Sequence, residues 1–582
     1  MISWLIALVI GLPWLGALLV CLPGDKRPQV QNAIAVVIAV ASGIVALLML
    51  PLTTGDTVVS IAVGSFFGDF TFVPDGLGVF LAVVATVVGS LAVIFSVDYM
   101  RGEAQLGRYY MWVLLFIGSM AGLVLTSSML LLFFFWEMVA ICSYALISFY
   151  NDDPKAVEGG IKALIVTQIG GIGLLVGALI SYSYLGTYDF GEFIANVGRI
   201  PQAAVAIMGF GFLLAGAAKS AQVPFHTWLP GAMEAPTPIS ALIHAATMVN
   251  AGVYLLARFY PAFVNVPGWT TGVVAVGALS ALLGACMALV ATDLKRVLAY
   301  STISQLGYMV YAVGVGGIFA SQYHLLSHAV FKALLFLAAG AVIHAVGTRD
   351  MLKMGGLGKK MPIVRTVFLI GALALAGLPI MNGFWSKELV LEAGIAGGPG
   401  WAYVAMLIGA GLTALYTLRM VNLVFYGKPQ QDHHVHDAPI AMKTALIPLA
   451  FGTLTTWLLA GGLAGLLEKS LPFHEFHTLN TTELVLEIIT APATYLALAV
   501  IALSILCWRQ RKAFAPLADM AKWPVRIAGA DFGFESINRG VVSATMSVAT
   551  ALRTTQTGQL NWNVLGIVGG FAAVLSLLVW GF

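Results

Sequence analysis

The chain has 582 residues, of which 60% are hydrophobic and only 9% are charged, and its formal net charge is +3. Soluble domains carry roughly 25% charged residues, so the composition excludes a soluble globular protein and indicates a polytopic membrane protein. There is no basic domain and no basic stripe interleaved with aromatic residues, which argues against nucleic-acid binding.

The first 20 residues, MISWLIALVIGLPWLGALLV, are interpreted as a transmembrane helix. They lack the basic start of a signal peptide, and their apolar run is too long for one. A span needs about 20 apolar residues. Sixteen segments meet this requirement, with centres near residues 12, 41, 87, 118, 139, 172, 212, 249, 280, 306, 334, 373, 414, 455, 498 and 571. The predicted fold class is an all-α polytopic membrane protein with about 16 transmembrane helices.

The basic residues of the connecting loops predict the orientation of these spans. Loops after odd-numbered spans hold Lys26, Arg27, Arg101, Arg108, Lys155, Lys295, Arg296, Arg349, Lys353, Lys359, Lys360, Lys428, Arg509, Arg511 and Lys512. Loops after even-numbered spans hold only Arg199, Arg258 and Lys469. Cytoplasmic loops are enriched in Lys and Arg, so we expect both termini outside a bacterial or archaeal inner membrane.

Two long stretches are not predicted to span the bilayer. Residues 51–76 form an outer loop with Asp56, Asp69 and Asp75 and no basic residue. Residues 509–560 lie on the cytoplasmic side. Within them, an apolar pattern of helical type is made by Ile537, Val541, Val542, Met546, Val548, Ala549 and Leu552. It suits an amphipathic helix lying along a surface, and an ordinary loop with a short helix remains the alternative.

Ionisable residues inside the predicted spans are the strongest functional signal. They are Glu137, Lys162, Lys219, His244, His324, His328, Lys332, His344, Lys387, Glu388 and Arg419. A charge at the bilayer centre costs at least ~2.5–3.5 kcal/mol on insertion scales, so such residues are functional candidates by default. The spacing of four between His324, His328 and Lys332 puts these three side chains near one helix face. A set of salt bridges or polar clamps between helices is the structural alternative.

The lysines favour proton transfer over a purely structural role. Arginine stays protonated in essentially any protein site, whereas a desolvated lysine can release its proton and a nearby carboxylate makes it hold the proton again. Histidine titrates near neutrality and suits the intermediate steps. Glu137, Lys219, His244, Lys332 and Lys387, with the histidines near Lys332, therefore supply the groups of a proton relay. The sequence does not show that they meet in space.

Two prolines near the buried lysines predict broken helices. Pro224 follows Lys219 by five residues, and Pro379 precedes Lys387 by eight. A proline inside a span frees a carbonyl, which is tolerated where water or polar groups can satisfy it. Breaks at matching places in spans seven and twelve are typical of an inverted repeat of spans four to eight and nine to thirteen. Two unrelated kinks are the alternative.

Metal and cofactor sites are poorly supported. Cys21, Cys142, Cys286 and Cys507 lie far apart without a CxxC pair, which favours small buried residues over disulfides, Fe–S ligation or haem attachment. The histidines of QQDHHVHDAP (430–439) are interpreted as part of a solvated loop rather than a metal site. No Walker A or Rossmann motif is present. We expect no cofactor and no metal in this chain.

Several motifs together resemble the antiporter-like membrane subunits of respiratory complex I and its relatives. They are PDGLGVF (74–80), FFFWEMVAICSYALISFY (133–150), AAKSAQVPFHTWLPGAMEAPTPISALIHAATMVNAGVYLLAR (217–258), TDLKRVLAYSTISQLGYM (292–309), YHLLSHAVFKALLFLAAGAVIHA (323–345), KMGGLGKKMP (353–362) and GLPIMNGFWSKE (377–388). The set is highly specific and covers most of residues 70–430. The set is most similar to the largest, distal type of subunit. The segment RTTQTGQLNWNVLG (553–566) also resembles the end of that subunit.

The resemblance implies a fold and a mechanism. It implies two inverted five-helix repeats, each with a broken helix, and a lateral helix near the carboxyl end. Glu137 would pair with Lys219, and His244 with the group His324, His328 and Lys332 would link two half-channels. Lys387, followed by Glu388, would pass the proton to the far side. Partners would be a neighbouring antiporter-like subunit and a small multispan subunit, with redox chemistry in a separate peripheral arm.

The chain also departs from that pattern. Gln168 and Gly171 stand where the sixth span of the complex I subunit commonly has arginine and aspartate, and Glu388 stands where aspartate is common. MEAPTP (233–238) also fits Mrp-type cation/proton antiporters and membrane-bound hydrogenases. Segment 509–560 is shorter than in the best-known complex I subunits, which predicts a shortened lateral helix.

The sequence thus predicts a proton-translocating, antiporter-like subunit of a complex I-type NADH:quinone oxidoreductase without a redox centre of its own. A subunit of a Mrp-type Na⁺/H⁺ antiporter or membrane-bound hydrogenase, a transporter that works alone, and a bracing scaffold are the alternatives. The predicted organisation is 1–109 for helices 1–3, 110–260 for the first repeat, 270–427 for the second repeat, 443–508 for helices 14–15, 509–560 for the lateral segment and 561–582 for the final helix.

Overall fold

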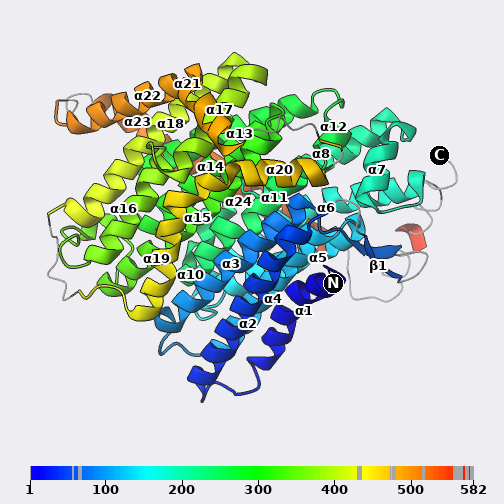
Figure 1. The fold of residues 1–582 in the computed structure, drawn as a ribbon, viewed down its shortest axis with the longest axis horizontal. Helices are drawn as coiled ribbons and strands as arrows, with labels where there is room; N and C mark the ends of the chain where they lie inside the picture. The colour runs from blue at the N-terminus through cyan, green and yellow to red at the C-terminus, as the bar shows by residue number, and fades with distance from the viewer. Residues whose placement is uncertain are drawn as a thin grey trace. The chain divides into compact units, whose positions relative to one another are not determined.

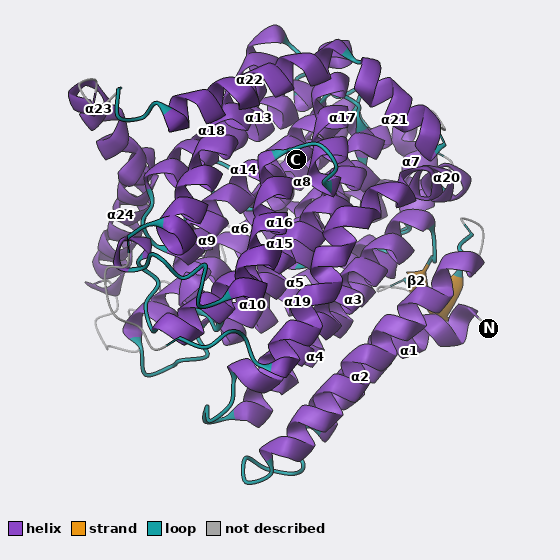
Figure 2. Cartoon of the chain, turned by 60° about the vertical axis from the view of Figure 1, so that its left-hand side comes forward, coloured by secondary structure: helices purple, strands orange, loops and turns teal. Residues whose placement is uncertain are grey.

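The computed structural model describes residues 2–54, 58–62, 68–428, 435–471, 473–474, 480–513, 518–554, 568–570 and 576. The chain divides into two compact units, residues 1–521 and residues 522–582, and each is described by itself. Among the described residues of the first unit, helices are the main secondary structure, and the strands form one short hairpin (Figures 1 and 2).

Thirteen helical segments of the described residues are long and apolar enough to cross a membrane. They are Ile2–Leu19, Pro28–Leu52, Gly76–Tyr99, Leu106–Leu125, Met129–Ile147, Pro154–Leu185, Gln202–Lys219, Thr237–Arg258, Trp269–Val290, Ile318–Val346, Gly400–Tyr426, Ile440–Ser470 and Pro492–Arg509. Two further predicted spans coincide with α14 (Leu294–Gly314), which is more polar, and α16 (Pro362–Ala376), which is shorter. The sixteenth, near residue 571, lies mostly outside the described residues, so the count of 16 stays a prediction.

The amino-terminal region holds α1 (Ile2–Leu19), α2 (Pro28–Met49) and α3 (Gly76–Tyr99), which pack in sequence order (Figure 1). The loop between α2 and α3, which is predicted to lie outside, contains an antiparallel hairpin of β1 (Val59–Ala62) and β2 (Asp69–Phe72), in which Val59 pairs with Phe72. The sequence analysis missed this hairpin. Its alternating β-branched and aromatic residues favour strands, and the rest of the described fold is helical as predicted.

The region predicted as the first repeat contains α4 (Leu106–Leu125), α5 (Met129–Ile147), α6 (Pro154–Leu185), α8 (Gln202–Lys219), and a span made of α10 (Thr237–Ala241), the π-turn η4 (Leu242–Ala246) and α11 (Met248–Arg258). Helix α7 (Phe190–Asn196) precedes α8, and the short α9 (Trp228–Gly231) follows it. Asp and Ser residues cap the first turns of α3, α5 and α6. The predicted break is confirmed, because α8 ends at Lys219 and Pro224 lies in the turn that follows.

The region predicted as the second repeat contains α13 (Trp269–Val290), α14, α15 (Ile318–Val346), α16, α17 (Asn382–Gly397) and α18 (Gly400–Val421), and the short α12 (Tyr260–Phe263) precedes it. The second break is also confirmed. Helix α16 ends at Ala376 and is followed by Gly377, whose φ of +78° suits glycine, and Pro379 lies between α16 and α17. Both breaks thus lie next to a buried lysine, while the inverted relation of the two repeats stays a prediction.

The remaining described helices complete the two units. The first unit contains α19 (Ile440–Thr455), α20 (Ala460–Ser470), α21 (Thr481–Thr490) and α22 (Pro492–Arg509). The boundary between the two units falls within α23 (Ala518–Gly529). The second unit contains α24 (Phe534–Thr554). This helix confirms the predicted helical pattern, since Ile537 and Val541, like Val548 and Leu552, are four residues apart and share a face. That it lies along a surface stays a prediction.

Candidate functional site

Glu137 and Lys219 lie close together where α5 passes the broken end of α8. Lys219 is fully buried, and its Nζ donates a hydrogen bond to the carbonyl oxygen of Trp136 at 2.8 Å and sits 4.8 Å from the centre of the Trp136 ring. The Glu137 carboxylate interacts electrostatically with this amine, but its Oε1 has no hydrogen-bond partner. Lys219 is the last residue of α8, where the partial negative charge of the helix end favours a cation.

Gln168 and Gly171 of α6 lie next to the Glu137 carboxylate. The Gln168 side chain lies beside the carboxylate, and a Cβ atom at Gly171 would clash with Glu137 Oε1. These are the two positions of the sixth predicted span at which the chain departs from the complex I pattern, and the structure shows that both lie next to Glu137. With glycine at 171, the carboxylate has room next to α6, and with glutamine at 168 it has a neutral neighbour there.

We expect Gly171→Ala to lower proton translocation by about tenfold, because the added methyl group displaces the Glu137 carboxylate and misplacing an acid–base group by about 1 Å can cost 10²-fold. Proton uptake by inverted membrane vesicles, normalised to the amount of complex, measures this. Gly462→Ala is the matched control, since nothing lies within 4 Å of its Cβ position. Unchanged uptake in Gly171→Ala would show that the position of Glu137 is unimportant.

Three buried groups of α15 form a row through the centre of the first unit. His324, His328 and Lys332 are all fully buried. His324 joins the row to neighbouring helices, with Nδ1 2.9 Å from Ser386 Oγ and Nε2 3.1 Å from Gln305 Oε1. Lys332 Nζ donates to the hydroxyl of Ser301 and, at 3.2 Å, to a carbonyl of α14. Both ring nitrogens of His328 lack a hydrogen-bond partner.

His244 extends this row toward the first half of the chain. It lies in the π-turn of its span, is fully buried, and stacks on Phe336 of α15 with 5.3 Å between ring centres. π-turns inside helices are frequent at functional sites. His244 interacts electrostatically with Lys332, and His328 interacts with both. Lys219 interacts electrostatically with Glu137, whereas His244 interacts with Lys295 and Lys332, so the structure brings the predicted residues together in two groups rather than one.

Lys387 and Glu388 end the row in α17. Both side chains are 1% exposed. Lys387 interacts electrostatically with His324 and Glu388, its Nζ lies 5.2 Å from the centre of the Tyr308 ring, and this Nζ has no hydrogen-bond partner. A Cβ atom at Gly377 would be 3.8 Å from the same Nζ. The amine therefore lies at the carboxyl end of α16, as Lys219 lies at that of α8, and both ends favour a cation.

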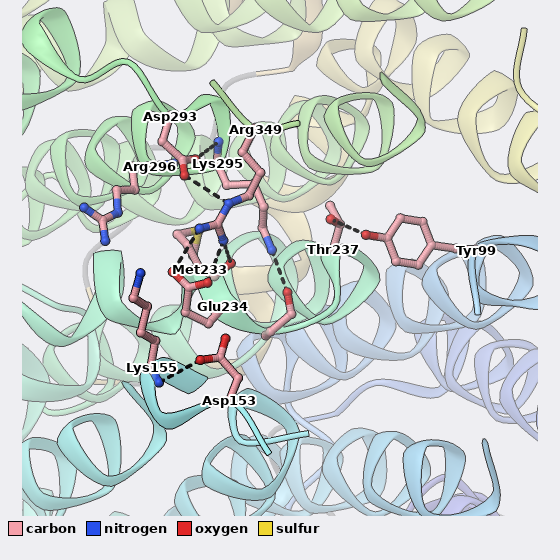
Figure 3. A network of polar contacts seen from close by, with 11 residues as sticks. Tyr99, Asp153, Lys155, Met233, Glu234, Thr237, Asp293, Lys295, Arg296 and Arg349 are labelled. Carbon is pink, nitrogen blue, oxygen red and sulfur yellow. Dashed lines mark hydrogen bonds and ion pairs between the residues drawn. The ribbon is translucent and has the colours of Figure 1, made fainter. Parts of the chain in front are cut away.

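A polar network closes the end of the bundle that is predicted to face the cytoplasm (Figure 3). Arg349 donates to both carboxylate oxygens of Glu234, at 2.9 and 3.0 Å, and pairs with Asp293 at 3.1 Å. Lys295 lies beside it, is 2% exposed, and donates to the carbonyl oxygen of Ala235 at 2.6 Å. The network joins the segment before α10 to the start of α14.

Lys295 is a candidate that the sequence analysis missed. The distribution of basic residues predicts a loop position for Lys295, but Asp293 caps α14 and brings Lys295 into the first turn of the helix, where it also interacts electrostatically with His244. The capping position of Asp293 was the available signal. His226 was missed as well. It is fully buried in the turn after α8 and interacts electrostatically with Lys162, but a lone histidine beside a proline carries no specific pattern.

Arg258 and Asp75 form a buried ion pair at the opposite end of the first unit. The expectation that Arg258 belongs to a loop is wrong, because it is the last residue of α11 and donates from both terminal nitrogens to Asp75 at the start of α3. His474 lies nearby, beyond α20, and burial together with the Arg258 charge lowers its pKa to about 4. These three residues line a cavity of about 150 Å³.

The other predicted charges are less central. His344 is exposed against the Tyr99 ring, and Arg419 donates to the carbonyl oxygen of Ala291 at 2.6 Å. Within the described ranges, no group of three or more His, Cys, Asp or Glu side chains could hold a metal ion. His433 and His434 lie outside those ranges, so the interpretation of their cluster as a solvated loop stays a prediction.

The family model for "NADH:quinone oxidoreductase/Mrp antiporter, TM" matches residues 126–413, and that for the "NADH-Ubiquinone oxidoreductase (complex I), chain 5 N-terminus" matches residues 61–110. NADH-quinone oxidoreductase subunit L of Pseudomonas aeruginosa is 37% identical over 549 residues, which cover 89% of this chain and 88% of that protein. Na⁺/H⁺ antiporter subunit A1 of Staphylococcus haemolyticus is 36% identical over 70% of this chain and 56% of its own length.

A solved structure supports the same relationship. A chain of the Mrp complex from Dietzia sp. DQ12-45-1b matches with a TM-score of 0.84 and 29% identity, over 99% of this chain and 63% of that chain. The matched family models include Glu137, Lys219, His244, the α15 row, Lys387 and Glu388. The chain belongs to the family of antiporter-like integral membrane subunits that NADH-quinone oxidoreductases and Mrp antiporters share.

Proposed function

We propose that this chain translocates protons as an antiporter-like membrane subunit of a complex I-type NADH:quinone oxidoreductase in a bacterial or archaeal inner membrane. The observation that carries the proposal is the unbroken row of buried titratable groups, each interacting with the next, from His244 through Lys332, His328 and His324 to Lys387 and Glu388. The relationship to a subunit L supports the parent complex.

The first step is set by Glu137 and Lys219. Lys219 keeps its proton while the carboxylate and the end of α8 stabilise the charge, and it releases the proton when the carboxylate moves away. The absence of a hydrogen bond between the two groups in this structure leaves that distance adjustable. Redox chemistry in other subunits drives the change, and no redox centre, cofactor or metal is assigned to this chain.

The histidines and Lys332 carry the proton across the middle of the bundle. The unpartnered ring nitrogens of His244 and His328 can each accept or donate a proton, and buried polar groups without protein partners are sites where ordered water is expected. Lys387 receives the proton, and Glu388 is the first acceptor on the way out. Water in the gap between Lys219 and His244 would join the two groups.

The partners follow from the same assignment. We propose a neighbouring antiporter-like subunit and a small multispan subunit within the membrane, with the peripheral redox arm acting indirectly, and both termini of this chain outside. A subunit of a Mrp-type Na⁺/H⁺ antiporter is the second candidate, favoured by the relative from Staphylococcus haemolyticus and by the Mrp structure.

Purification of the tagged chain from its native membrane separates these two candidates. We expect flavin- and Fe–S-containing subunits in the preparation, and NADH oxidation that drives proton uptake into inverted vesicles without added Na⁺. Mass spectrometry identifies the subunits and a fluorescent pH probe follows the uptake. A preparation that lacks the redox subunits and exchanges Na⁺ for protons without NADH would establish the antiporter instead.

A further inference from the structure

We propose that Glu392 and Glu487, with Tyr403 beside Glu392, form the path by which the proton leaves Glu388 for the side predicted to be outside. This inference rests on the proposed function, since it concerns the release of the proton that reaches Lys387. It adds residues from three elements, α17, α18 and α21, of which none was a candidate from the sequence.

Glu388 is a buried carboxylate without hydrogen-bond partners, so a proton that reaches it needs a further acceptor on the way to solvent. Its side chain is 1% exposed and neither carboxylate oxygen has a hydrogen-bond partner, although Thr494 of α22 lies beside it. An unpaired buried carboxylate costs free energy, and native proteins satisfy such groups with water or with a proton. The neighbouring Lys387 amine has no hydrogen-bond partner either, so two adjacent groups are free to exchange a proton.

Glu392 lies one helical turn beyond Glu388 on α17. Positions i and i+4 share a helix face, and the two carboxylates interact electrostatically. Glu392 is partly exposed, and its Oε2 is buried without a hydrogen-bond partner. The Tyr403 hydroxyl near the start of α18 is also buried without a partner and interacts with both carboxylates. Glu392 therefore lies between the buried Glu388 carboxylate and the carboxyl end of α17.

Glu487 continues the path to the surface. Helix α21 packs against α17, and the Glu487 carboxylate, which is partly exposed, interacts electrostatically with Glu392. Figures 1 and 2 both show α21 and α22 next to α17. Glu388 is buried, whereas Glu392 and Glu487 are partly exposed. The three carboxylates therefore lead from the buried row toward solvent. Like charges on neighbouring helices have no structural benefit, because carboxylates in contact repel each other.

Each transfer is a simple exchange of one proton. The Lys387 ammonium gives a proton to the Glu388 carboxylate, which leaves a neutral amine and a carboxylic acid. Glu388 passes the proton to the Glu392 carboxylate and becomes a carboxylate again. Glu392 passes it to Glu487, directly or through water next to Tyr403, and Glu487 releases it to bulk water. No electron is transferred.

The test is the double variant Glu392→Gln/Glu487→Gln in the whole complex, assayed for NADH-driven proton uptake per complex in inverted vesicles. Glutamine keeps size and hydrogen bonding but cannot carry a proton. We expect uptake to fall at least about tenfold, and the double variant with aspartate at both positions to retain at least about half of it. Wild-type uptake in the glutamine variant, or equal losses with glutamine and aspartate, overturns the path.

Two further variants separate the possible failures. Glu483→Gln on the same helix is the matched control, because Glu483 belongs to the capping box of α21 and glutamine is accepted there; it should pump like the wild type. Lys387→Met reports on the proposed function itself. If Lys387→Met pumps normally, the relay fails, whereas loss in Lys387→Met with normal uptake in the glutamine double variant removes only this exit path. Should the double variant not assemble, the two single glutamine variants are judged by the same criterion.

Discussion

Replacing Lys219 or Lys387 by methionine is expected to reduce proton translocation by about 10–100-fold, the range in which loss of a positioned acid–base group falls. Methionine fills nearly the same volume, so it removes the titratable amine without leaving a cavity in a fully buried site. Electron transfer should fall less than translocation, or in proportion to it if the two are tightly coupled. NADH oxidation and vesicle acidification, recorded in the same preparation, give both rates.

Controls for this prediction come from the same chain. Lys469→Met removes an exposed lysine from the last turn of α20 and should leave both rates unchanged. The amount of assembled complex in the membrane must equal that of the wild type, because loss of a buried residue can also act through assembly. If both buried-lysine variants assemble normally and pump with wild-type stoichiometry, the chain is a scaffold and the relay assignment is wrong.

The cost of burying these lysines explains why the sequence alone located the two broken helices beside them. An amine inside a span is expensive, so it stands out, and a proline close to it marks the broken helix that stabilises the charge. Both features are local in the sequence. The sequence could therefore predict that Lys219 and Lys387 lie inside spans and next to a broken helix, as Lys219 does at the end of α8 and Lys387 does beside the end of α16.

The residues that the sequence did not yield depend on contacts between distant segments. Lys295 follows a capping aspartate and was counted with the loops, and only its approach to Ala235 shows that it is buried. In the sequence Glu487 is an ordinary acidic residue between two predicted spans, and only the packing of α21 against α17 sets it apart. Hydropathy and periodicity describe one helix at a time, so they contain no information about such pairs.

Gln168 and Gly171 also show that a sequence difference cannot be interpreted without knowing the contacts of the residues involved. The sequence showed that an arginine and an aspartate were missing relative to the family pattern, but not what this meant. In the structure both positions face Glu137, so the substitution removes two charges from the surroundings of one carboxylate. The first half of the proposed relay therefore depends on the Glu137–Lys219 pair with fewer neighbouring charges than the resemblance implied.

The second large expected effect concerns stability. Arg258→Met should lower the stability of the first unit by about 3–5 kcal/mol, because breaking a buried ion pair leaves an uncompensated charge. Asp75 and Arg258 are each 6% exposed. The same Asp75 carboxylate accepts a hydrogen bond from Gly78 N at 2.8 Å and caps α3, so its loss of a partner also disturbs the junction between α3 and α11. The thermal unfolding midpoint of the purified complex and its amount in the membrane measure the effect.

The pair Asp98–Arg101 provides the matched comparison. It joins the same two residue types at 2.6 Å, but the Arg101 side chain is 76% exposed, so Arg101→Met should cost no more than about 1 kcal/mol. Adding Asp75→Asn to Arg258→Met should recover part of the loss, since asparagine still caps α3 and no longer leaves a buried charge. A double variant as unstable as Arg258→Met alone would mean that the arginine acts through its packing on Tyr254, whose ring centre is 5.3 Å from the guanidinium, and not through the charge of Asp75.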